Sequence, residues 1–198
     1  GFAATRFIVD VAEHGNGQGH HHHPHRHLPD IRRIIEAAGL PPRAAERAET
    51  IFRRLAQAEA QVHNTSIDEV HFHEVGAVDS IVDVVGACVA LELLDVETVT
   101  ASPVPLGNGT IECAHGRLPA PAPATVALLR GVPTFPGPNE GEATTPTAAA
   151  VLTALASSFG PLPAMKLAAV GYGAGSRSGG AVPNLLRALF GEGAFSAA

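Results

Sequence analysis

Residues 69–94 read Glu-Val-His-Phe-His-Glu-Val-Gly-Ala-Val-Asp-Ser-Ile-Val-Asp-Val-Val-Gly-Ala-Cys-Val-Ala-Leu-Glu-Leu-Leu, and the prediction of the fold starts from this stretch. Polar and apolar residues alternate over residues 69–73, which predicts a short strand. Gly76 provides a turn, and residues 79–94 then form a helix whose apolar side chains fall on nearly every face. A helix that is apolar all round is typical of a protein interior. We therefore expect a buried helix directly after a strand.

Two further helices are predicted upstream of this stretch. Asp30 is a suitable N-cap for a helix over residues 31–38, and Gly39 follows that helix as a stop signal. Residues 41–42 are both proline and open a longer helix that runs to about residue 62. The apolar stripe of this helix has helical spacing and consists of Ile51, Leu55, Ala58 and Val62.

The chain begins with a strand-like run over residues 5–11, followed by a segment rich in glycine and histidine over residues 14–27. Such a composition does not form a packed element, so we expect a flexible loop. Gly1 is not an initiator methionine, and the sequence opens close to a strand. We therefore expect this chain to be a piece of a longer one.

Strands and helices are mixed along the rest of the chain. The pattern predicts strands over residues 97–101, 109–113, 165–170 and 185–190, and helices over residues 122–130 and 146–157. This order favours an α/β (α+β) fold, a mixed β-sheet packed with helices, with two subdomains left open. The expected parts are residues 1–29 with the strand and His-rich loop, residues 30–95 with most of the early helices, and residues 96–198 with the sheet.

The composition excludes several classes of protein. The 198 residues are 45% hydrophobic with a formal net charge of −6 and no basic stripe, so we expect no nucleic-acid partner. No apolar run is long enough to cross a bilayer, and nothing near the start resembles a signal peptide. The expected protein is therefore cytoplasmic, with no membrane partner. Because the chain has only two cysteines, we do not expect a disulfide framework.

A metal site is predicted around residues 71–83. His71 and His73 share one strand face, because side chains alternate along a strand. Asp79 and Asp83 share one helix face, because they are four residues apart. An Asp inside an apolar helix is costly unless it is paired or binds metal. The candidate ligands are His71, His73, Asp79, Asp83 and, at the end of the preceding helix, His63. Two readings without metal stay open, Asp79 as a helix N-cap and His71 as a core histidine.

A second metal-binding feature is the His-rich loop itself. It holds six histidines, His20, His21, His22, His23, His25 and His27. Neutral imidazoles bind nickel, zinc and copper well, and a flexible cluster offers many ligand sets. A purification tag is the alternative, although this run is internal and interrupted by Pro24 and Arg26. A loop of this kind can store or deliver metal without fixing one geometry.

Three other features are candidates for chemistry. Cys113 and His115 share a strand face and could act as ligands or as a nucleophile and its base. Thr145 and Thr147 flank Pro146 at a helix start, where free amides can bind a phosphate, although a plain cap is equally consistent. The glycine-rich run around Gly173 follows a strand and lets backbone approach a ligand closely, or it is a plain turn.

Several of these motifs together resemble the LarC family, the nickel-insertion proteins of nickel-pincer nucleotide biosynthesis. The resemblance rests on residues 70–83, on His-Gly-Arg-Leu-Pro-Ala-Pro-Ala-Pro-Ala at residues 115–124, and on the Thr-Pro-Thr motif. Gly-Tyr-Gly-Ala-Gly at residues 171–175, Pro-Asn-Leu-Leu-Arg at residues 183–187 and the His-rich loop fit the same pattern. The resemblance covers nearly the whole chain.

The resemblance implies a reaction and its partners. Family members insert nickel into pyridinium bisthiocarboxylic acid mononucleotide with the use of CTP, and they form nickel–carbon and nickel–sulfur bonds. The implied enzyme is a cyclometallase or nickel chelatase of the lyase class, and its product serves lactate racemase and related enzymes. It implies nickel, the thiolated nucleotide and the lactate racemase apoprotein as partners, while CTP and its divalent metal are assigned to a domain outside this chain. A homo-oligomer stays open.

The base that accepts the proton of the ring carbon is expected among Glu74, Asp79 and His115, and the substrate nucleotide near Thr145, Thr147 and Gly173. Two other functions remain alternatives. The chain could be a nickel chaperone or storage module without chemistry of its own, which needs only the His-rich loop. It could also be a zinc-dependent hydrolase that uses the same ligands.

Overall fold

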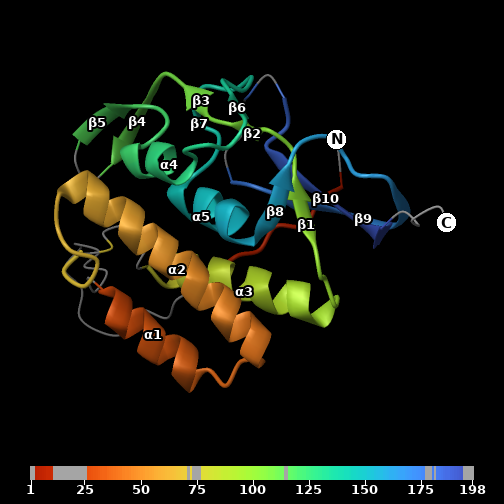
Figure 1. The fold of residues 1–198 in the computed structure, drawn as a ribbon. Coiled ribbons are helices and arrows are strands. Elements are labelled where there is room, and N and C mark those ends of the chain that lie inside the picture. The colour runs from red at the N-terminus through yellow and green to blue at the C-terminus, as the bar shows by residue number, and fades with distance from the viewer. Residues whose placement is uncertain are drawn as a thin grey trace.

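The computed structural model describes residues 3–10, 26–70, 72, 77–113, 116–176, 180 and 182–193. This part of the chain contains both helices and strands, which confirms the predicted mixed α/β class (Figure 1). The helices are α1 (Leu28–Ala37), α2 (Pro42–His63), α3 (Val78–Leu93), α4 (Pro123–Leu128) and α5 (Pro146–Leu155).

The described strands pair in twos. The antiparallel pairs are β3 (Gly107–Asn108) with β7 (Gly141–Glu142), β4 (Thr110–Cys113) with β5 (Gly116–Pro119), and β9 (Met165–Ala174) with β10 (Leu185–Gly193). The parallel pairs are β1 (Val99–Ala101) with β8 (Ala156–Phe159) and β2 (Val104–Pro105) with β6 (Thr134–Phe135). The four predicted strands downstream are present as β1, β4, β9 and β10. The helix predicted to end at residue 157 ends earlier, because Ala156 already pairs with Val99.

Helix α2 is the centre of the helical part and contacts α1, α3, α4 and α5 (Figure 1). The predicted stripe is mostly confirmed: Ile51 and Leu55 are fully buried, and Ala58 is 5% exposed. Val62 is 40% exposed, so its assignment to the stripe is wrong. The last turn of the helix extends beyond the core, and Asn64 ends it with a φ of 50°.

Helix α3 is only half buried, and the prediction that it is mostly buried is wrong. Its buried residues are Ile81, Val84 and Cys88, which lie on one face. Asp79, Asp83 and Leu93 are exposed, and Leu93 is 80% exposed. The helix packs one side against α2 and leaves the other at the surface. Apolar composition alone therefore overestimates the burial of this helix.

The start of helix α1 also differs from the prediction. His27 is the N-cap and Asp30 is the third helical residue, so Asp30 is not the N-cap. The Asp30 carboxylate instead accepts a hydrogen bond from the backbone N–H of His27 at 2.9 Å. This satisfies a donor that a helix start leaves without an intrahelical partner. The predicted stop is confirmed, since the helix ends at Ala37 and Gly39 has a φ of 61°.

Two predicted strands are present only as bridges in the described residues. In residues 3–10, Thr5 forms a parallel bridge with Gly173. In the predicted strand over residues 69–73, Phe72 forms an antiparallel bridge with Arg26. Val11, most of the His-rich loop, His71 and His73 lie outside the described residues.

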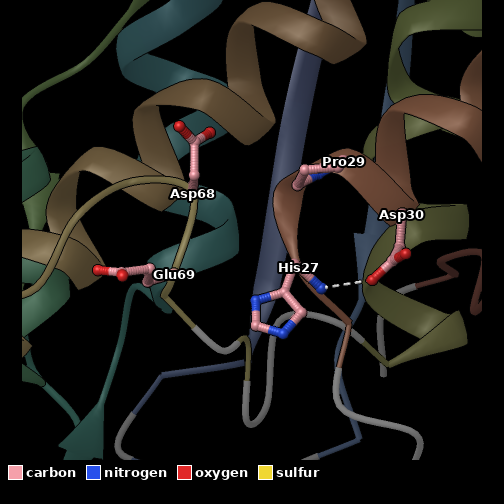
Figure 2. A pocket seen from close by; sticks show the side chains of 5 residues that line it. All are labelled: His27, Pro29, Asp30, Asp68 and Glu69. Atoms are coloured by element: carbon pink, nitrogen blue, oxygen red, sulfur yellow. Dashed lines mark hydrogen bonds between the residues drawn. The ribbon is translucent and has the colours of Figure 1, made fainter.

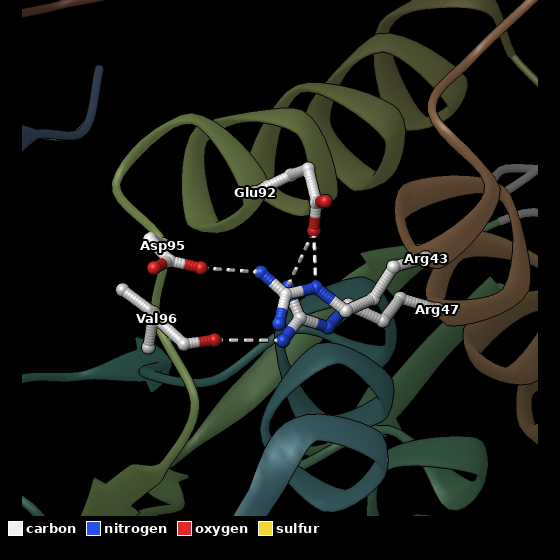
Figure 3. A network of polar contacts seen from close by, with 5 residues as sticks. All are labelled: Arg43, Arg47, Glu92, Asp95 and Val96. Carbon is white, nitrogen blue, oxygen red and sulfur yellow. Dashed lines mark hydrogen bonds and ion pairs between the residues drawn. The ribbon is translucent and has the colours of Figure 1, made fainter.

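A network of arginines and carboxylates joins the start of α2 to the end of α3 (Figure 3). Arg43 pairs with Glu92 and, at 3.1 Å, with Asp95. Arg47 donates to the carbonyl oxygen of Val96 at 2.8 Å and lies 3.8 Å from Glu92. The network fixes the crossing of the two helices and the chain that leads into β1.

Candidate functional site

The backbone around the predicted metal ligands is anchored in the core. Phe72 is 2% exposed and Val70 is 1% exposed, and both belong to the hydrophobic cluster formed by α1, α2 and α3. The N–H of Phe72 donates to the carbonyl oxygen of Arg26 at 3.2 Å. The end of the His-rich loop therefore lies beside the segment that carries the predicted imidazoles. His71, His73, Glu74 and His115 themselves lie outside the described residues.

Asp79 and Asp83 lie on the exposed face of α3. Ala77 is the N-cap of this helix, so the reading of Asp79 as an N-cap is wrong. The Asp79 carboxylate accepts the N–H of Ser80 at 2.8 Å. Asp83 is exposed, which removes the argument that burial forces it to bind metal. Partial burial, followed by the charge of Asp79, raises the pKa of the Asp83 carboxyl. The two carboxylates thus form one negative patch on the first two turns.

His63 is the last residue of α2, and its Nε2 atom lies 3.6 Å from the Glu59 carboxylate. The two residues are four positions apart and therefore share one face of the helix. Across the described ranges, no three His, Cys, Asp or Glu side chains gather closely enough to hold a metal ion. The part of the chain that is described therefore does not unite His63, Asp79 and Asp83 in one site.

An open pocket of about 460 Å³ lies between the start of α1 and the turn before Val70. Its lining residues are His27, Pro29, Asp30, Asp68 and Glu69 (Figure 2). The pKa of Asp30 is lowered, mainly because its carboxylate accepts the hydrogen bond from the His27 backbone. The positive charge of Arg33 lowers it further. This pocket is not among the sites predicted from the sequence. Its only sequence signal is that His27 ends the His-rich loop and that Asp68 and Glu69 precede the predicted strand.

The Thr-Pro-Thr motif begins helix α5 as predicted. Thr145 is the N-cap, and its hydroxyl oxygen accepts the N–H of Ala148 at 3.3 Å. The preceding Thr144 is 6% exposed and donates its hydroxyl to the carbonyl oxygen of Pro105 at 2.6 Å. Strands β3 and β7 hold this junction in place. A Cβ on Gly107 would lie 2.0 Å from the carbonyl oxygen of Gly141, so only glycine permits this approach.

Gly173 lies on β9, where it pairs with Leu186 and bridges Thr5. Apart from Gly173 itself and its two chain neighbours, no heavy atom of the described chain lies within 4 Å of the position that its Cβ would occupy. The space above this glycine is therefore open, which is compatible with a ligand but equally with a plain strand. Cys113 is half-buried and its thiol lies 3.3 Å from the carbonyl oxygen of Gly116, across the β4–β5 turn.

No helix in the described part of the chain is long and apolar enough to span a membrane.

Comparison with known proteins assigns the chain to a family. A sequence profile described as nickel insertion protein matches residues 1–197. A protein of Geobacter metallireducens, named as a candidate nickel insertion protein, is 53% identical over 192 residues, which cover 97% of this chain and 47% of that protein. The pyridinium-3,5-bisthiocarboxylic acid mononucleotide nickel insertion protein of Desulfitobacterium hafniense is 52% identical over 167 residues, which cover 84% of this chain and 41% of that protein.

This chain therefore spans about half the length of the curated relatives that it matches. No solved structure matches it. The predicted resemblance is confirmed, because the profile covers nearly every residue and about half of the aligned residues are identical in the relatives. The chain belongs to the nickel insertion protein family.

Proposed function

We propose that this chain is the nickel-binding part of a protein that inserts nickel into pyridinium-3,5-bisthiocarboxylic acid mononucleotide. The observation that carries this proposal is the family match over residues 1–197, together with a relative at 52% identity that is named for this reaction. The proposal includes the finer assignments: a cyclometallase of the lyase class, CTP with a divalent metal bound outside this chain, and delivery of the product to a lactate racemase apoprotein.

The nickel ligands in this proposal are His71 and His73, with Asp79, Asp83 or His63 as further candidates. Imidazole and carboxylate ligands hold nickel reversibly, whereas the sulfurs of the substrate are softer ligands that can take it over. The anchored backbone at Phe72 supports a defined site in this segment, because fixed neighbours restrict the positions of the ligands. The exposed pair of Asp79 and Asp83 supports a local negative potential that attracts a divalent cation.

Nickel–carbon bond formation releases the proton of the ring carbon, so a base must accept it. We propose Glu74, Asp79 or His115 for this role. The substrate phosphate is proposed to dock at the start of α5, near Thr145 and Thr147, with Gly173 as a further contact. The Thr145 cap supports this assignment, because a helix of ten residues begins there and its dipole favours an anion.

Turnover tests the function directly. A polypeptide of the relatives' length that contains this sequence is incubated with the thiolated nucleotide, nickel and CTP, and the product is followed by mass spectrometry. Nickel-containing nucleotide is the expected result. Tight nickel binding without product, with CTP present, would favour a storage or chaperone role and contradict insertion.

A further inference from the structure

The antiparallel pair of β9 and β10 presents an apolar sheet face to the surface. Alternate residues of a strand point to the same face, and residues paired across two strands share that face. One face, here called the ribbon face, consists of Leu186, Ala188 and Phe190 of β10 and of their partners Gly173, Gly171 and Ala169 of β9. All of these residues are exposed, Leu186 to 72% and Phe190 to 39%. None of them has a polar side chain.

The opposite face of the same two strands is also mostly apolar. Leu167, Val170 and Tyr172 lie on it with exposed fractions of 53%, 45% and 36%. Arg187 pairs with Tyr172 and adds one charge to this face. An antiparallel sheet with one face in water alternates apolar and polar residues, whereas a sheet buried on both faces is apolar nearly throughout. The two strands therefore have the composition of a sheet that is covered on both faces.

The described part of the chain provides little of this cover. In Figure 1, β9 and β10 lie on the opposite side of the molecule from α1. Among the described elements, each of these two strands makes its extensive contacts with the other. The outer edge of β9 is occupied at one point, where the N–H of Thr5 donates to the carbonyl oxygen of Tyr172 at 2.9 Å. No other described strand pairs with the outer edge of β10. A sheet of two strands is marginally stable by itself, so a covering surface would stabilise it.

We propose that the ribbon face is covered, in a polypeptide of the relatives' length, by the part of that polypeptide that lies outside this chain. The residues that match the Geobacter metallireducens protein are 97% of this chain but 47% of that protein, so more than half of such a polypeptide is available as cover. Two parts of one polypeptide meet at a high effective concentration. This inference goes beyond nickel insertion and does not depend on it.

The chemistry of the ribbon face defines the surface that fits it. Contiguous exposed apolar patches of this kind mark sites of interaction. Beyond the adjacent residues, no heavy atom of the described chain lies within 4 Å of the positions that a Cβ on Gly171 or Gly173 would occupy. Side chains of a partner can therefore reach the backbone between Leu186 and Phe190. The covering surface is apolar, and its side chains fill the space above these two glycines.

Photo-crosslinking in a polypeptide of the relatives' length that contains this sequence tests the proposal. Leu186 is replaced by p-benzoylphenylalanine, which on irradiation bonds covalently to groups that it touches. The matched control carries the same probe at Arg54, an exposed position of α2. A mixture of unlabelled and heavy-isotope-labelled protein lets mass spectrometry separate cross-links within one polypeptide from cross-links between two copies. Circular dichroism establishes folding, and a probe at Phe190 replaces the first if that variant does not fold.

We expect the probe at Leu186 to form cross-links within one polypeptide to residues outside the 198 of this chain, and the probe at Arg54 to form none. Cross-links between labelled and unlabelled copies would show instead that a second copy covers the ribbon face, and would overturn the proposal. Cross-links only to residues of this chain, or no cross-link from Leu186, would overturn it too. Equal yields from Leu186 and Arg54 would show that the ribbon face is not a preferred contact, with the same consequence.

Discussion

At the scale of single residues, the environment of each side chain decides its chemistry more than its type does. Asp83 is exposed beside Asp79, and partial burial and the charge of Asp79 raise the pKa of its carboxyl. Cys88 is fully buried, and burial raises the pKa of its thiol to about 11. The burial of Cys88 can be predicted from its apolar neighbours in the sequence. The exposure of Asp83 cannot, because the partners that cover α3 are distant in the chain.

Asp83→Asn should stabilise the fold at neutral pH. With a raised pKa, the folded state holds the proton more tightly than the unfolded state, so stability falls as pH rises through the pKa of Asp83. The asparagine variant lacks this loss and should gain about 0.2–0.5 kcal/mol, the size of a like-charged i, i+4 pair. Urea unfolding should show the gain at neutral pH and its disappearance below pH 3.8, the ordinary pKa of the group. A gain that does not depend on pH would contradict the cause given.

The two cysteines should differ in reactivity. Ellman's reagent at neutral pH is expected to modify Cys113, which is half-buried, while Cys88 reacts only after denaturation because its thiol is buried and protonated. The count of released thiolate should be one in the native state and two in denaturant. Cys113→Ser serves as the control and should abolish the native reaction. Rapid modification of Cys88 in the folded protein would show that α3 is not packed as described.

At the scale of elements, local pattern explains the helices better than their surroundings. Proline lies at the start of α1, α2 and α5, and Gly39 and Asn64 follow the ends of α1 and α2; these signals are visible in the sequence. The short strands β2, β3, β6 and β7 are two residues each and exist only through partners elsewhere in the chain. No local period can predict a strand of that length. The same holds for the bridge between Arg26 and Phe72, which replaces the predicted strand in the described residues.

The contact between α2 and α3 should depend on Arg47 more than on Arg43. The side chain of Arg47 is 18% exposed and donates to the carbonyl oxygen of Val96, whereas Arg43 is 40% exposed and makes surface pairs. Arg47→Ala should cost about 1.5–3 kcal/mol, as for hydrogen bonds of charged groups. Arg43→Ala should cost less than about 1 kcal/mol. Urea unfolding of both variants measures the difference, and equal costs would contradict the role given to Arg47.

The start of α5 offers a test in which stability and binding move in opposite directions. Thr147→Glu places a negative charge in the first turn, which should stabilise the helix by about 0.3–1 kcal/mol. The same charge should repel the substrate phosphate and weaken its binding. Thr147→Gln is the neutral control of equal size and should bind nearly as the parent does. Substrate titration by calorimetry decides the matter, and unchanged affinity in Thr147→Glu would exclude this helix start as the phosphate site.

At the scale of the whole molecule, the sequence predicts the class of fold and the family better than it predicts the site. The run at residues 70–83 and the Thr-Pro-Thr motif indicate the family because they are specific in their order, and the comparisons confirm it. The Thr145 cap is confirmed because it depends on neighbours in sequence. The union of His63, Asp79 and Asp83 depends on how separate helices pack, which spacing does not determine. The described residues do not bring these three together.

We propose that the segment His71–Glu74 binds nickel. The most direct measurement is a nickel titration of His71→Ala with His73→Ala, in the full chain with the five loop histidines from His20 to His25 replaced by asparagine. The parent with those five changes is the control, and circular dichroism establishes that both are folded. We predict that the parent binds one nickel tightly and that the double variant loses this binding. Equal nickel affinity in the two proteins would contradict the assignment and leave these histidines with a structural role only.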